Sequence, residues 1–98
     1  MPATMIAFYK EPPDREKFDK HFFEVHLPLV RKIPGLLKLE VERFAGKGAP
    51  YYIMVTLYFN NKEERKAGLN SPEGQATSVD LPNYAEPGSF IIAFADVV

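Results

Sequence analysis

Two histidines, His21 and His26, are the side chains of this sequence best suited to acid–base chemistry near neutral pH. The chain has no cysteine, so a thiolate nucleophile and thiolate metal ligands are excluded. At about 100° per helical residue, the two imidazoles would lie about 140° apart around a helix. Two histidines that share a metal on one helix need a spacing of three or four residues, so no bound metal is predicted.

Pro28 should disturb the backbone beside His26. It has no N–H to donate, its ring crowds the carbonyl of Glu24, and it disfavours helical angles at Leu27, so a kink or a break is expected there. A freed carbonyl could accept a hydrogen bond from Nδ1–H of His26 and leave Nε2 as an acceptor. His26 is therefore predicted to be a catalytic general base, or alternatively to pin the bend. His21 lies among charged residues and is predicted to be a solvated surface residue.

The apolar spacing predicts six secondary-structure elements around these histidines. We expect strands over 4–10, 36–45, 51–59 and 89–98, a first helix from the N-cap Asp14 to Pro34, and a broken helix from about 60 to 84. In the first helix, large apolar residues recur at a helical period: Phe18, Phe22, Val25, Leu29 and Ile33. This stripe is expected to face the core.

The order strand, helix, strand, strand, helix, strand is that of a ferredoxin-like βαββαβ fold. It predicts an α+β domain over 1–98, with a four-stranded antiparallel sheet, two helices on one face, and the first and third strands in the centre. The other face would carry Tyr52, Met54 and Tyr58 without cover. A second copy of the chain is the expected partner on that face.

Charge and hydropathy narrow the range of partners. The formal net charge of -1 leaves no basic field for a nucleic-acid backbone. No apolar run approaches the ~20 residues of a membrane span. The segment MPATMIAFYK lacks the pattern of a signal peptide, so we expect a cytoplasmic protein without nucleic-acid or membrane partners.

Three stretches resemble the EthD family: FYKEPPDREKF at 8–18, HFFEVHLPLVRKIPGL at 21–36 and SPEGQATSVDLPNYA at 71–85. The resemblance implies a dimeric α+β barrel, in which each subunit has a pocket between its sheet and its helices. Relatives often carry tryptophan where this chain has Phe23 and tyrosine where it has Leu39, so no substrate follows from the resemblance. Related barrels include cofactor-free monooxygenases, lactone isomerases, aromatic cyclases and haem-handling proteins.

The residues and the resemblance together predict a small homodimer that binds a hydrophobic, oxygenated small molecule. The expected activity is that of a cofactor-independent oxidoreductase (monooxygenase-like) or an isomerase or cyclase in catabolism, with His26 as the base. The predicted pocket residues are Tyr52, Tyr58, Met54, Tyr9 and Phe22. No cofactor is required by this prediction; the alternative is a non-catalytic accessory protein that holds a metabolite or haem.

Overall fold

The computed structural model describes residues 1–98 and contains one antiparallel sheet. Its strands are β1 (Ala3–Tyr9), β2 (Lys38–Arg43), β3 (Ile53–Phe59) and β4 (Phe90–Asp96). Their order in the sheet is β2-β3-β1-β4, so the first and third strands are central, as predicted. The ferredoxin-like α+β fold predicted from the sequence is confirmed.

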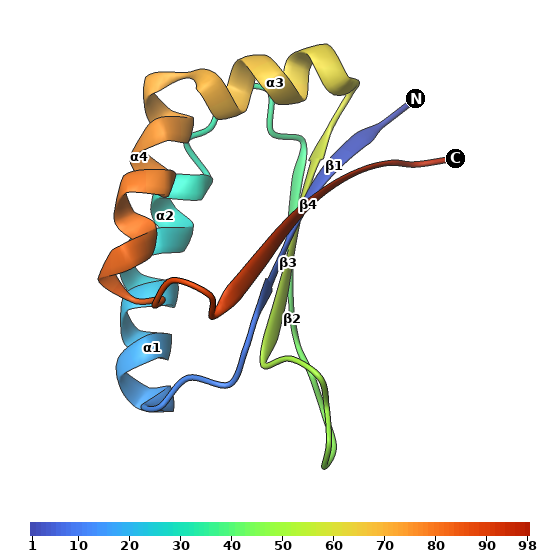
Figure 1. Ribbon diagram of the computed structural model, residues 1–98. Coiled ribbons are helices and arrows are strands. Elements are labelled where there is room, and N and C mark those ends of the chain that lie inside the picture. The colour runs from blue at the N-terminus through green and yellow to red at the C-terminus, as the bar shows by residue number, and fades with distance from the viewer.

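The helices all cover one face of this sheet, and the other face is open (Figure 1). They are α1 (Arg15–His21), the π-helical segment η1 (Phe22–His26), α2 (Leu27–Val30), α3 (Lys62–Asn70), α4 (Pro72–Asp80) and the 3-10 turn η2 (Leu81–Asn83). Asp14 caps the first helix as predicted, since it accepts from the backbone N–H of Lys17 at 3.1 Å. Asn61 caps α3 by accepting from the backbone N–H of Glu64 at 2.8 Å. No helix has both the length and the apolar character needed to cross a bilayer.

The first helix passes Pro28 through a π turn rather than a break. The backbone N–H of Leu27 donates to the carbonyl of Phe22, five residues earlier. A wider turn suits this position because Pro28 has no N–H and its ring would meet the Glu24 carbonyl of a regular α-turn. Leu27 keeps helical angles, with φ -60° and ψ -40°, so the expected break and the expected distortion of Leu27 are wrong.

The π turn changes which residues of this helix face the sheet. Val25, predicted to be in the core, is 43% exposed, whereas His26 is only 6% exposed. Leu27 and Val30 are also buried. The extra residue in the turn moves the buried positions from Val25 and Leu29 to His26 and Val30, whereas Ile33 is buried as predicted.

The main core lies between the helices and the covered face of the sheet. Phe22, Phe59 and Ile53 are its largest fully buried side chains. Tyr9, from β1, meets Phe18 and Phe22 edge-on, at centroid distances of 5.6 and 5.5 Å. The end of β1 is thereby held against the start of the first helix, next to both histidines.

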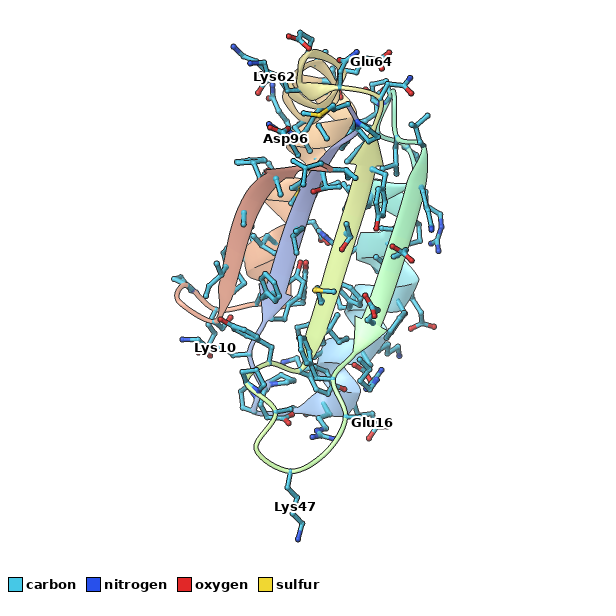
Figure 2. The ribbon with its side chains drawn as sticks, turned by 90° about the vertical axis from the view of Figure 1, so that its right-hand side faces the viewer. Lys10, Glu16, Lys47, Lys62, Glu64 and Asp96 are labelled. Carbon is cyan, nitrogen blue, oxygen red and sulfur yellow. The ribbon has the colours of Figure 1, made fainter.

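The open face carries the alternate side chains of the same strands (Figure 2). The strand register places Phe8 beside Met54 and Thr4 beside Tyr58. Tyr58 also donates to Glu40 on β2 at 2.5 Å. Tyr52 was expected on this face, but it lies just before β3 and packs against Phe18 on the helix side, with the ring centroids 5.6 Å apart. That expectation is wrong because the alternation of β3 does not extend back to Tyr52.

Candidate functional site

Asp80, the last residue of α4, connects the two histidines of the first helix. Its Oδ1 lies 2.8 Å from Nε2 of His21, and its Oδ2 lies 3.0 Å from Nδ1 of His26. The side-chain amide of Asn83 also donates to Oδ1, at 3.1 Å. We refer to His21, Asp80 and His26 as the histidine–aspartate cluster.

The π turn explains how both histidines reach one carboxylate. In a π-helix the backbone bond joins residues five apart, so residues spaced like His21 and His26 point toward the same side. A regular helix would have separated them by about 140°. The prediction that His21 is a solvated surface residue is wrong, since its side chain is 28% exposed and its ring stacks on Tyr84 with the centroids 5.4 Å apart.

Asp80 carries its negative charge in a buried position. Burial alone would raise its pKa, but the hydrogen bonds from Asn83, His21 and His26 outweigh burial and hold the pKa of Asp80 below its usual range. An ionised carboxylate can only accept hydrogen bonds. His21 must therefore donate from Nε2 and His26 from Nδ1.

His26 is consequently a buried, neutral and oriented imidazole at neutral pH. Burial lowers its pKa, and this effect outweighs the hydrogen bond to Asp80, which raises it. With Nδ1 donating to Asp80, the lone pair is on Nε2, to which no protein group bonds. No fully buried side-chain nitrogen or oxygen lacks a partner, so Nε2 keeps some access to solvent. The expected Nδ1 partner, a freed backbone carbonyl, is replaced by Asp80.

Asp80 was not identified from the sequence, although one local signal pointed to it. It ends α4, where the partial negative charge of the helix C-terminus disfavours a carboxylate. An acid in this position suggests a specific cationic or hydrogen-bonding partner. No local pattern in the sequence identifies that partner, because His26 is 54 residues away from Asp80.

Tyr84 joins the cluster to the core. Its ring centroid lies 4.7 Å from that of His26 and 5.9 Å from that of Phe22. Its hydroxyl is 2.7 Å from the hydroxyl of Tyr9. Burial raises the pKa of Tyr9 to about 12 and also raises the pKa of Tyr84, so both phenols are neutral at pH 7.

A cleft of about 550 Å³ reaches this region from the surface. Phe18, His21 and Tyr84 line its inner part. Its remaining wall is largely polar and includes Lys10, Lys17, Lys20, Glu24 and Glu86. Solvent thus meets the histidine–aspartate cluster through His21 and Tyr84.

The five predicted pocket residues fall into three places. Tyr9 and Phe22 are on the helix side and contact Tyr84, beside the cluster. Tyr52 is also on the helix side but bonds to Asp19, at 2.8 Å. Met54 and Tyr58 are on the open face, so the sheet separates them from His26. No group of three or more His, Asp and Glu side chains is arranged to hold a metal ion.

The charge state assigned to His26 leads to a pH prediction. We expect NMR titration of the imidazole of His26 to give a pKa below the ordinary value of about 6.5. The pKa of His26 should be still lower in Asp80→Asn, because this change removes the carboxylate that raises it. Folding lowers the pKa of His26. The contribution of this group to the free energy of unfolding is therefore complete above pH ~6.5 and is lost as the pH falls through the pKa of the folded state. A pKa above that of a model peptide would contradict the assignment.

The fold and the cluster define a ferredoxin-like α+β protein with a buried histidine–carboxylate site at one end of its sheet. The family described as the EthD domain matches residues 10–88. This chain belongs to the EthD family.

Two relatives cover most or all of the chain. A Rhodococcus erythropolis protein, described as an uncharacterized 11.0 kDa protein in the thcB-thcC intergenic region, is 34% identical over 83 residues, which are 82% of this chain and 81% of the relative. The crystal structure of an ethyl tert-butyl ether d (EthD) family protein from Bacillus halodurans is 31% identical, covers 100% of both chains and has a TM-score of 0.93. The Bacillus halodurans protein is itself described as a member of the EthD family.

More distant solved structures share the fold. A dimeric ferredoxin-like protein from Thermobifida fusca has a TM-score of 0.76 at 14% identity, over 99% of this chain and 92% of the other. SnoaB, a cofactor-independent oxygenase from Streptomyces nogalater, has a TM-score of 0.73 at 10% identity, over 98% and 92%. Dimers and an oxygenase thus occur among proteins with this fold.

Proposed function

We propose that this protein is a small homodimeric enzyme that removes a proton from a hydrophobic, oxygenated small molecule, with His26 as the general base. The observation that carries the proposal is the state of the imidazole. It is buried and neutral, Asp80 holds it at Nδ1, and Nε2 is left to accept a proton.

The cluster supports this role at both stages of proton transfer. Before transfer, the carboxylate of Asp80 fixes the tautomer of His26 and the orientation of its ring. After transfer, the same negative charge, 3.0 Å from Nδ1, stabilises the imidazolium. Such a histidine–carboxylate pair needs no cofactor to act as a base.

The product of the first step is a resonance-stabilised substrate anion. That anion can react with O₂, as in a cofactor-independent monooxygenase, or be reprotonated at another atom, as in an isomerase or cyclase. The likeness to SnoaB concerns the fold alone, so it supports including the oxygenase outcome but does not choose between the two outcomes. Proton removal by His26 is common to both.

The open face of the sheet, which no helix covers (Figure 1), supports the proposed homodimer. The strand register puts the apolar residues Ile6, Phe8 and Met54 on that face. A second copy of the chain would bury these residues. The dimeric protein from Thermobifida fusca, which shares the fold, supports this part of the proposal.

Deuterium exchange tests the base directly. Anthrone and 1-tetralone, two apolar cyclic ketones with acidic C–H bonds, are incubated with the protein in D₂O, and exchange is followed by mass spectrometry. We expect the wild-type protein to accelerate exchange and His26→Ala to reduce the acceleration by about 100-fold or more, as for loss of a general base. Asp80→Asn should retain less activity than the wild type.

Glu16→Gln serves as the control, because Glu16 is an exposed residue of α1 away from the cluster. It should exchange like the wild type, and all variants should sediment as dimers. Equal exchange by His26→Ala and the wild type would refute the role of His26. Ligand binding without exchange would favour the non-catalytic accessory role.

A further inference from the structure

The hydroxyl pair of Tyr9 and Tyr84 has more hydrogen-bond donors than the protein uses. Two neutral phenols carry two hydrogens, and the single bond between them, 2.7 Å long, uses one. No other hydrogen bond engages either hydroxyl. One phenolic hydrogen therefore has no acceptor in the protein.

The hydroxyl pair is partly buried, with aromatic rings around Tyr9. Tyr9 is 4% exposed and contacts Phe18, Phe22 and Phe90, at centroid distances of 5.6, 5.5 and 6.5 Å. Because the pair is only partly buried, its spare hydrogen is available to a ligand that enters from the surface. Phe18 and Tyr84 also line the cleft, which gives a ligand a route to the pair.

The hydroxyl pair and the base are close enough to act on one small molecule. The ring centroids of Tyr84 and His26 are 4.7 Å apart. Burial, and to a smaller extent the charge of Asp80, raises the pKa of both phenols, so the pair remains a donor while Nε2 of His26 remains an acceptor. A donor and an acceptor on neighbouring residues, among aromatic rings, suit a planar substrate with an oxygen near an acidic C–H bond.

We propose that the Tyr9–Tyr84 pair donates a hydrogen bond to the substrate's carbonyl oxygen, which restricts the substrates to planar, enolisable carbonyl compounds. This inference rests on the proposed function. The C–H proton moves to Nε2 of His26, and the electron pair of that bond becomes an enolate with its charge on oxygen. The phenolic hydrogen stays on tyrosine and stabilises that charge, which is the task of an oxyanion hole.

Binding of 2-naphthol, a planar mimic of the enol, tests the donor without requiring turnover. Its affinity is measured by fluorescence titration and compared with that of naphthalene, which has the same ring system and no oxygen. We expect the wild-type protein to prefer 2-naphthol, and Tyr84→Phe and Tyr9→Phe each to weaken 2-naphthol binding by about tenfold while leaving naphthalene unchanged. Both variants keep the aromatic ring, so the packing around His26 is retained.

Tyr58→Phe is the matched control, because the hydroxyl of Tyr58 bonds to Glu40 on the open face of the sheet. It should bind both ligands like the wild type. Equal weakening of both ligands, no weakening in either tyrosine variant, or no preference for 2-naphthol in the wild type would overturn the proposal. His26→Gln should keep the preference for 2-naphthol, so a failure of the base and a failure of the hydroxyl pair give different results.

Discussion

Replacing Phe22 with alanine is expected to lower the free energy of unfolding by about 4 kcal/mol. Phe22 is fully buried, and its ring lies within 6.0 Å, between centroids, of the rings of Phe18, Tyr84 and His26. Removing it leaves a cavity where the first helix meets the sheet, at the position from which the π turn begins. Chemical denaturation at pH 7 measures the effect.

The neighbouring Phe23 provides a control of the same residue type. It is 41% exposed, so Phe23→Ala should cost about 1 kcal/mol or less. A similar loss in the two variants would contradict the orientation of the helix. The expected loss of unfolding free energy in Phe22→Ala is a large part of the stability of a small domain. Phe22→Leu, which leaves a smaller cavity, should therefore be measured as well.

Replacing Asp80 with alanine is expected to cost about 3 kcal/mol at pH 7, because the change leaves the buried Nδ1–H of His26 without an acceptor and removes two partly buried hydrogen bonds. Asp80 is 7% exposed and accepts hydrogen bonds from His21, His26 and Asn83. Asp80→Asn keeps the size of the side chain and one acceptor oxygen, so it should cost less. Urea denaturation of the three proteins measures both differences.

The effect of Asp80 should depend on pH with a definite sign. Its pKa is lowered by folding, so its contribution is complete above the unfolded pKa of about 3.9 and is lost as the pH falls through the folded pKa. The stability difference between the wild type and Asp80→Ala should therefore shrink below pH ~4. A difference that stays constant down to pH 2 would show that Asp80 acts through packing and not through its charge.

The sequence by itself determined the order of the elements and the architecture of the sheet. Alternating apolar residues marked the strands, and Asp14 marked the start of the first helix, which the structure confirms. The order of the elements placed the segment 51–59 in the centre of the sheet, as the structure confirms. These features depend on local preferences and on burial of one face, both of which can be read from a short window of sequence.

The candidate site was determined only by the tertiary structure. A fixed angle of about 100° per residue placed Val25 inward and His21 away from His26, whereas the π turn reverses both assignments. Pro28 signalled a disturbance, but the packing of the helix on the sheet decided its form. The meeting of Asp80 with His26 depends on how α4 lies along the first helix, a contact across 54 residues that no local pattern contains. The sequence thus singled out His26 as a candidate, and the fold supplied the carboxylate that orients it.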